Sequence, residues 1–420
     1  MIVYLKINNC FIYNNQVQFT LKADKRCKRF KSNIASSHDI LKSAIVFGPN
    51  NSGKTNLVKC IKSIKSIILN ESPSLMSNFY LDSSVCVLEI CFLNNEQEYI
   101  FEVRYDCSKK EFLYEKLSYI EYDKYNNSKE TIVFVRDFEK QMFDCQNDEL
   151  KLIMKTTSKN NILIYLIDTD QFDILRDAKN ILISFATKID IINMNNIPDR
   201  KTLEMMKLSN EAQKKIVNFI LSADLSLDDF RYISDEELSS HLQITNNDPN
   251  NIQEDIMKIP SNLMERLHFV SVYKDVVLPS VFFDSTGTKK IIALAGYVID
   301  ALEKGRILVV DELDNSLHFK LTRAIISLFN NELNKCAQLI CTVHDFTLLD
   351  CKKMFRKEQI WFSYKDRDNA YLYSLSEFTA CRDGVRGDED DLLEKYKKGV
   401  FGALPEPDLF QTLLEAQDNE

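Results

Sequence analysis

The stretch that decides the fold is Phe47–Asn56, FGPNNSGKTN. Before Gly287 the chain contains only two glycines, Gly48 and Gly53, and both lie in this stretch. Residues 48–55, GPNNSGKT, match the pattern GxxxxGK[ST] at every fixed position. Glycine is needed where the backbone turns tightly and its amide groups point at phosphate oxygens. The stretch therefore predicts a phosphate-binding loop.

The sequence on both sides of the loop supports this prediction. An apolar run, SAIVF at 43–47, predicts a buried strand leading into it, and apolar residues at helical spacing follow Thr55. In such a loop Lys54 reaches the β- and γ-phosphates of ATP, and the Thr55 hydroxyl binds Mg²⁺. The ATP-binding residues predicted here are Gly48, Pro49, Asn50, Asn51, Ser52, Gly53, Lys54 and Thr55.

A second motif supplies the acids that a nucleotide site needs. The stretch RILVVDELDNSLH places Asp311 and Glu312 after an apolar run at 307–310. Asp311 is predicted to hold Mg²⁺, and Glu312 to orient and deprotonate the attacking water. Acidic residues are common at strand ends, so this motif indicates a nucleotide site only because the chain also contains the phosphate-binding loop.

The spacing of the two motifs predicts the fold class. A long stretch separates Lys54 from Asp311, whereas compact hexameric motors keep these motifs close. The predicted fold is α/β: an ABC-type P-loop ATPase head of the SMC-like kind, with a mixed sheet, flanking helices, an antiparallel β part and a helical insertion. The predicted parts are an ATPase lobe with the P-loop and the antiparallel part (1–144), a helical insertion (145–265), an ATPase lobe with the remaining motifs (266–380) and a C-terminal tail (381–420).

Heads of this class carry a signature before the acidic strand and a histidine after the next strand. Ser285 and Gly287, in FDSTGTKKIIALAG, begin a predicted helix whose N-terminus faces a phosphate of a second subunit. The alternative for this pair is an ordinary helix cap. His344 follows the apolar run QLICTV and is predicted to contact the γ-phosphate, while Asp314 fits the loop that crosses the dimer interface. His318 is expected to pack or cap.

Composition limits the other classes of function. The net charge is −9, and no apolar run is long enough for a membrane helix. The 11 cysteines are scattered without a CxxC pair, which indicates reduced thiols and a cytoplasmic protein rather than disulfides or a zinc cluster.

Three further features leave alternatives open. Six basic residues in 22–31, with Lys59, Lys62 and Lys65, predict either a solvated face or a contact with nucleic acid or an effector. Asp366 and Asp368 form a DxD pattern, interpreted as a strand turn rather than a nuclease site because little chain follows them. Gln97 lies at a predicted hairpin turn, so no glutamine loop is assigned.

Several stretches together resemble a known family. STGTKKIIALAG, ILVVDELDNSLH, CTVHDFTLLD, EQIWFSYKDRDNAYLYSLSEF and YKKGVFGALPE are similar to the ABC-type, SMC-like ATPases of bacterial anti-phage and abortive-infection systems. The resemblance covers roughly 1–60 and 280–405, and its signature is STGT where transporters have LSGGQ. It implies an ATP- and Mg²⁺-dependent ATPase that closes as a homodimer or higher homo-oligomer and regulates a separate effector, a nuclease or a toxin. The alternatives are a RecF-type DNA-repair ATPase that binds DNA directly and a slow, nucleotide-gated scaffold.

Overall fold

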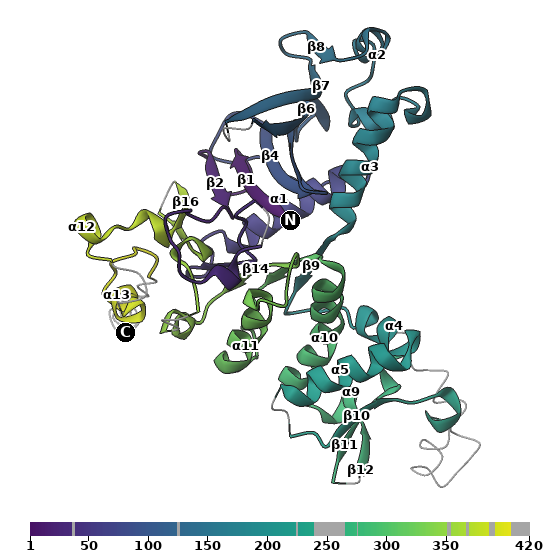
Figure 1. The fold of residues 1–420 in the computed structure, drawn as a ribbon, viewed down its shortest axis with the longest axis vertical. Coiled ribbons are helices and arrows are strands. Elements are labelled where there is room, and N and C mark those ends of the chain that lie inside the picture. Colours follow the sequence, from purple (N-terminus) through teal and green to yellow (C-terminus); the bar gives the residue numbers. More distant parts are fainter. Residues whose placement is uncertain are drawn as a thin grey trace, which may run out of the picture.

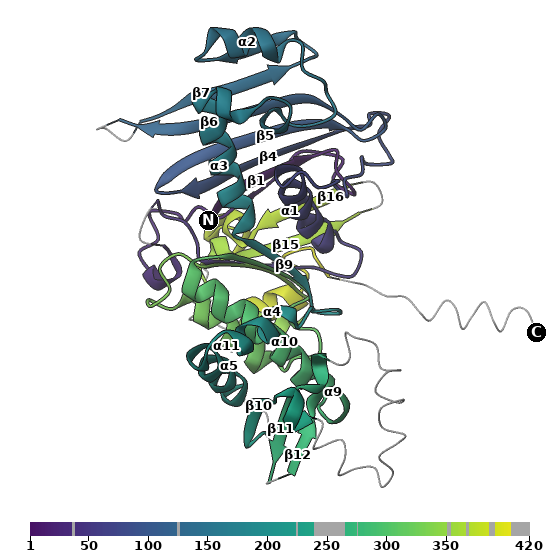
Figure 2. The same cartoon turned by 90° about the vertical axis from the view of Figure 1, so that its right-hand side faces the viewer.

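The computed structural model describes residues 1–35, 38–123, 127–223, 226–238, 265–274, 276–350, 354–366, 369–385 and 391–404. Three sheets follow one another along the long axis of the molecule (Figures 1 and 2). The middle sheet carries the phosphate-binding loop and both acids, so its construction positions the candidate site.

The middle sheet has six strands, of which five are parallel. Only the edge strand β16 runs antiparallel, against β15. Their order is β16 (Ala370–Ser374), β15 (Ile360–Lys365), β3 (Ser43–Phe47), β14 (Gln338–Val343), β13 (Ile307–Asp311) and β9 (Ile189–Asn193).

Both faces of this sheet are covered, which explains why its strands are apolar almost throughout. Ile307 and Val309 of β13 point into the core shared with α1 (Lys54–Ile68) and the antiparallel sheet. Leu308 and Val310 point into the opposite core, which contains residues of α10 (Thr286–Lys304) and α11 (Phe319–Asn330). The carboxyl ends of the parallel strands therefore lie at one edge, between these two layers.

The second sheet is antiparallel and lies on the side of α1. It confirms the prediction of an antiparallel part flanking the first helix, and Gln97 begins a strand directly after its hairpin turn. The strands run in the order β2 (Val17–Thr20), β1 (Ile2–Asn8), β4 (Val85–Asn94), β5 (Gln97–Asp106), β6 (Glu111–Tyr122), β7 (Ser128–Asp137) and β8 (Met142–Cys145).

A small antiparallel sheet lies at the other end of the molecule, beside the start of α10 (Figure 1). It consists of β10 (Asp229–Tyr232), β11 (Phe269–Tyr273) and β12 (Val276–Pro279). Asp284 ties it to the following helix, because its carboxylate accepts hydrogen bonds from Ser271 Oγ at 2.6 Å and Tyr273 Oη at 2.8 Å.

The helices described are short or amphipathic, and none is both long and apolar enough to cross a membrane. They are α1 (Lys54–Ile68), α2 (Asp148–Met154), α3 (Asp173–Thr187), α4 (Arg200–Leu208), α5 (Asn210–Ser222), α9 (Ser280–Phe283), α10 (Thr286–Lys304), α11 (Phe319–Asn330), α12 (Ala380–Asp383) and α13 (Leu392–Lys397). Short 3₁₀ turns occur at Lys31–Asn33, Leu163–Tyr165, Thr169–Gln171, Phe346–Asp350, Lys357–Gln359 and Leu375–Glu377.

The structure corrects the prediction for 145–265. Helices α2 to α5 do lie in this segment, but β9 is an integral strand of the middle sheet, paired in parallel with β13. Strand β10 belongs to the small sheet. A short apolar run after a helix does not reveal which sheet it joins, so sequence patterns alone do not distinguish this mixed segment from a helical one. The outer limits of the four predicted parts remain predictions, and residues 239–264 and 405–420 lie outside the described residues.

Candidate functional site

The phosphate-binding loop joins β3 to α1, as predicted, and both of its glycines are required by close contacts. A Cβ atom on Gly48 would lie 2.3 Å from the Ser363 carbonyl oxygen in β15, closer than any side chain tolerates. A Cβ on Gly53 would lie 2.3 Å from Ile12 Cδ1, and Gly53 also has a φ of 110°, which favours glycine. These contacts answer why an otherwise glycine-poor chain has two glycines here.

The first turn of α1 lacks the side chains that usually neutralise a helix N-terminus. Gly53 provides no side-chain cap, and no acidic residue lies in the first turn, so the positive end of the helix is open to an anion. Lys54 is buried, and its Nζ donates hydrogen bonds to the carbonyl oxygens of Gly48 at 2.5 Å and Pro49 at 2.9 Å. Burial lowers the pKa of Lys54 to about 8, although nearby carboxylates favour its charged form.

A cavity of about 250 Å³ opens above this turn. It includes Ser52, whose Oγ is buried and has no hydrogen-bond partner among the described residues. A buried hydroxyl without a partner is costly, and a phosphate oxygen would satisfy it. The cavity therefore fits an anionic ligand. Its lining consists of Asn50, Asn51, Ser52, Gly53, Lys54, Thr55, Asn56, Lys59, Glu312 and His344.

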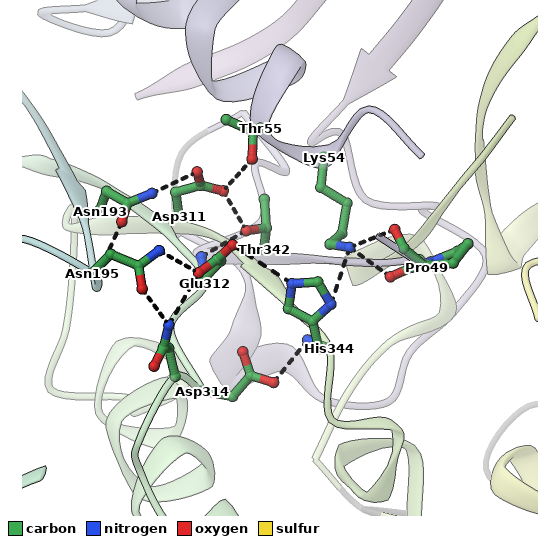
Figure 3. Close-up of polar contacts among 12 residues, drawn as sticks. Pro49, Lys54, Thr55, Asn193, Asn195, Asp311, Glu312, Asp314, Thr342 and His344 are labelled. Atoms are coloured by element: carbon green, nitrogen blue, oxygen red, sulfur yellow. Dashed lines mark hydrogen bonds and ion pairs between the residues drawn. The ribbon is translucent and has the colours of Figure 1, made fainter. Parts of the chain in front are cut away.

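Asp311 lies at the end of β13, facing the start of α1 (Figure 3). Its Oδ1 accepts hydrogen bonds from Thr342 Oγ1 at 2.7 Å and Thr55 Oγ1 at 3.3 Å, and its Oδ2 accepts one from Asn193 Nδ2 at 2.9 Å. A carboxylate next to a threonine hydroxyl is the kind of oxygen pair that Mg²⁺ binds together with substrate phosphates. The residues present thus fit a magnesium ion shared with a nucleotide.

Glu312 is held in place by two asparagine side chains (Figure 3). Asn195 Nδ2 and Asn315 Nδ2 donate to its Oε2 at 2.7 and 3.1 Å, and Asn315 also donates to Asn195 Oδ1 at 2.6 Å. Partial burial disfavours ionisation of Glu312, but these hydrogen bonds and the charges of His344 and Lys54 outweigh it, so its pKa is lowered. Glu312 is therefore an ionised acceptor at neutral pH.

His344 connects the two sides of the cavity. Its Nδ1 lies 3.4 Å from Lys54 Nζ, and its Nε2 lies 3.8 Å from Glu312 Oε1 (Figure 3). The carboxylate of Asp314 fixes the backbone here, because its Oδ2 accepts from the amides of His344 at 2.7 Å and Asp345 at 2.6 Å. The structure thus brings together every predicted residue of the P-loop, the acidic pair and the histidine.

The predicted signature does not join this cavity within its own chain. Ser285 caps α10, because its Oγ accepts from the Thr288 amide at 3.1 Å, which is also the alternative interpretation of this residue. Gly287 packs against the loop after Glu312, and a Cβ on it would lie 2.8 Å from the Ser316 carbonyl oxygen. Neither residue lines the P-loop cavity.

The remaining sequence features have mainly structural contacts. His318 caps α11, as expected. Asp366 closes the β15–β16 hairpin by accepting from the Asn369 amide at 2.7 Å, whereas Asp368 lies outside the described residues. The described residues contain no group of three His, Cys, Asp or Glu side chains arranged to hold a metal ion.

Ion pairs hold several residues of the basic segment 22–31. Lys22 contacts Glu98 at 3.1 Å, Lys25 contacts Asp39 at 3.5 Å, and Arg26 contacts Asp24 at 2.8 Å. In addition, the fully buried Arg356 donates to the backbone carbonyls of this segment. These contacts favour a structural role, while the nucleic-acid contact stays a prediction.

Sequence reasoning missed four side chains of the site: Asn193, Asn195, Asn315 and Thr342. Asn193 ends β9 and Asn195 follows it, so the only signal in the sequence is a polar residue at the end of a short apolar run. Thr342 does stand out, as the one polar residue near the end of the apolar run QLICTV.

Comparisons with known proteins relate the chain to one family model and to two solved structures. Residues 43–350 match the family model described as "AAA domain, putative AbiEii toxin, Type IV TA system". The fold is similar to the SMC head domain from Thermotoga maritima, at 10% identity and a TM-score of 0.42, with 89% of this chain and 98% of that chain covered. It is also similar to an SmcHead bound to the C-winged helix domain of ScpA, at 12% identity and a TM-score of 0.42, with 89% and 97% covered. No curated protein sequence matches the chain.

Proposed function

The chain belongs to the AAA-domain family whose model it matches, and from this membership we propose that it binds ATP with Mg²⁺ and hydrolyses it in the cavity above α1. One observation carries the proposal: a buried lysine, a threonine–aspartate oxygen pair and an ionised glutamate converge on one anion-sized cavity. Phosphoryl transfer needs this combination of positioning and charge.

Binding of the triphosphate is assigned to the P-loop. The open N-terminus of α1 and the Ser52 hydroxyl would face phosphate oxygens, and Lys54 would turn from its carbonyl partners toward the β- and γ-phosphates. Thr55 and Asp311 would hold Mg²⁺, which neutralises charge between the β- and γ-oxygens.

Hydrolysis is assigned to Glu312. Water attacks the γ-phosphorus, the bond from that phosphorus to the bridging oxygen of ADP breaks, and the proton of the water passes to the glutamate carboxylate. Asn195 and Asn315 hold that carboxylate in place, and His344 bridges it to Lys54. His344 would then contact the γ-phosphate.

The test of this function is phosphate release from ATP by the purified protein, with Mg²⁺ and with Mg²⁺ removed by EDTA. Multiple turnovers that stop on removal of Mg²⁺ support the proposal. A single turnover per chain, seen in a rapid-quench experiment, would instead indicate a nucleotide-gated scaffold. No hydrolysis and no ATP binding would contradict the proposal.

We further propose that each site is completed by a second chain. In its own chain the signature does not line the P-loop cavity, and two strongly exposed phenylalanines, Phe282 and Phe283 at 60% each, lie just before Asp284 and Ser285. Exposed apolar side chains beside a helix N-terminus are suited to an interface with a second copy that brings ATP to this helix. The proposed state is a head-to-tail homodimer.

Ser285→Asp tests the signature, with Ser285→Asn as its matched control. Both replacements are good N-caps, so α10 should remain capped in either variant. Only aspartate places a negative charge against the γ-phosphate, and we expect hydrolysis to fall by about tenfold or more in that variant alone. Gly287 is unsuitable for this test, because any side chain there would displace the loop at Ser316.

Mixing the Ser285→Asp protein with a Lys54→Ala protein decides whether the site is shared. A mixed dimer has one site with both defects and one site with neither, so hydrolysis should return on mixing. If the two chains exchange, as followed by a size or affinity tag, and no activity returns, the two-chain site is wrong. A Ser285→Asp protein as active as Ser285→Asn would also exclude it.

The biological role that we propose is control of a separate effector in phage defence. Its support is the resemblance of the motif-bearing stretches to defence ATPases and a family description that names a toxin–antitoxin system. The docking surface assigned to the effector is the segment 145–262, of which α4 and α5 lie beside the small sheet (Figure 1). The free thiols of the described cysteines are compatible with a cytoplasmic location.

Co-purification with the product of the neighbouring gene, with and without ATP, tests this role. We expect a complex whose recovery changes at least severalfold with nucleotide. A protein that protects cells without any neighbouring gene would contradict it. A gel shift of DNA by the purified chain alone would favour the RecF-type alternative, for which the basic segment 22–31 is the candidate surface.

A further inference from the structure

A second cavity lies beside the signature helix, at the junction between the small sheet and the middle sheet. Its volume is about 290 Å³, and it shares no lining residue with the P-loop cavity. Its walls come from the loop after β9, the start of β11, α9 and the first turns of α10. The lining residues are Met194, Asn195, Asn196, Ile197, Asp199, Arg266, Phe269, Ser280, Val281, Thr286, Lys289, Lys290, Ile292 and Ala293.

The charge of this cavity favours an anion. Three cations line it, Arg266, Lys289 and Lys290, against a single acid, Asp199. Asp199 is neutralised by Arg266, whose Nε lies 2.5 Å from its Oδ2. The Lys289 ammonium has no hydrogen bond or ion pair within the part of the chain that the structure describes. A lone cation that faces a partly enclosed cavity would gain most from a negatively charged ligand.

The remaining lining residues favour a ligand in which the anionic group is attached to an organic part. Phe269, Met194 and Ile197 supply apolar surface, while Asn196 and Thr286 supply hydrogen-bonding groups. Ligand pockets are mainly apolar with a few placed polar groups, and their volumes begin at roughly 300 Å³. A cavity of about 290 Å³ thus suits a small molecule, of about the size of one nucleotide.

Two lining residues connect the cavity directly to Glu312. Asn195 donates to Glu312 Oε2 at 2.7 Å. Lys290 Nζ donates to Asn315 Oδ1 at 2.8 Å, and Asn315 in turn donates to the same Glu312 oxygen at 3.1 Å. A ligand that binds Asn195 competes with one hydrogen bond to the glutamate, and a ligand that binds Lys290 competes with the contact that holds Asn315, the donor of the other.

We propose that this cavity binds a small organic phosphate of nucleoside monophosphate size, and that its occupancy slows ATP hydrolysis by withdrawing Asn195 and Lys290 from the Glu312 network. The phosphate contacts Lys289 and Lys290, and the organic part packs on Phe269. The binding site stands on the cavity itself, whereas the effect on hydrolysis rests on the proposed function.

Binding is measured in the Lys54→Ala protein, in which the ATP site is disabled, by equilibrium dialysis with radiolabelled AMP. We expect AMP to bind, and the additional change Lys289→Glu to weaken it by about tenfold or more, because a charge-assisted hydrogen bond becomes a repulsion. Lys214→Glu, at an exposed position of α5 outside the cavity, is the matched control and should leave binding unchanged. Absent AMP binding, or binding unaffected by Lys289→Glu, overturns the proposal.

Two further probes separate the parts of the ligand. Adenosine, which lacks the anion, should bind much more weakly than AMP, and equal binding would exclude the cationic site. Inorganic phosphate should also bind more weakly, and equal binding would exclude a role for the apolar wall. Lys289→Gln removes the charge without reversing it, so it gives the same comparison if Lys289→Glu fails to fold.

The regulatory part is tested on the enzyme with an intact P-loop. AMP should lower the rate of phosphate release by about fivefold or more, the lower end of usual coupling between sites. This inhibition, expressed relative to the rate of each protein without AMP, should be lost in Lys289→Glu. Inhibition that persists in Lys289→Glu places AMP in the ATP site and overturns the regulation. A protein without any ATPase activity refutes the proposed function instead, and dialysis still decides the binding site.

Discussion

Replacement of Lys54 by alanine is expected to abolish ATP binding and hydrolysis together. Lys54 is only 5% exposed and is the one buried cation in the lining of the P-loop cavity. Each charge-assisted hydrogen bond that it makes to a phosphate contributes about 1.5–3 kcal/mol, so its loss should weaken ATP by about 100-fold or more. Equilibrium binding of a fluorescent ATP analogue and phosphate release measure the two effects.

The lowered pKa of Lys54 gives this prediction an independent check. In the free protein its pKa is about 8 because of burial, so near pH 8 a large fraction of Lys54 is neutral. A bound phosphate favours the charged form and raises the pKa, so ATP binding near pH 8 should take up protons, and ATP affinity should fall as the pH rises above 8. Calorimetry in buffers of different ionisation enthalpy detects this uptake.

The proton uptake should disappear in Lys54→Ala. Lys62→Ala, at an exposed position two turns further along α1, is the matched control and should behave as wild type. Wild-type ATP affinity in Lys54→Ala would remove Lys54 from the site.

The part of this site that could be predicted from sequence is the part built by local patterns. The phosphate-binding loop needs glycine, lysine and threonine at fixed spacing because a single backbone turn surrounds the phosphates. Its sequence pattern can therefore be identified without knowledge of the fold. The acidic pair and His344 each follow a mainly apolar run, and these runs form β13 and β14. Parallel strands place their ends at one edge, which brings the three motifs together.

The part that could not be predicted depends on contacts between distant segments. Asn193 and Asn195 reach Asp311 and Glu312 only because β9 pairs with β13. Nothing in a short apolar run specifies that pairing. Likewise, Gly48 is required by the Ser363 carbonyl of a strand more than 300 residues away in sequence. Such requirements become visible only once the chain is folded.

Glu312→Gln should separate ATP binding from hydrolysis. Glutamine keeps the shape of the side chain, and its Oε1 can still accept from Asn195 and Asn315, so the network around it should persist. An amide cannot accept the proton of the attacking water. Loss of a positioned general base should lower the hydrolysis rate by about 10²–10⁴-fold, with ATP affinity preserved.

The retained nucleotide should then reveal the assembly. Since hydrolysis opens the proposed dimer, ATP bound to Glu312→Gln should hold the dimer closed, and the dimer should accumulate in light scattering coupled to size separation. Glu303→Gln makes the same chemical change at an exposed pair with Lys215 and should leave both rate and size unchanged. If Glu312→Gln hydrolyses ATP at the wild-type rate, another residue is the base. If it binds ATP but remains monomeric, closure is not coupled to the nucleotide, and the exposed phenylalanines before Ser285 must serve a different partner.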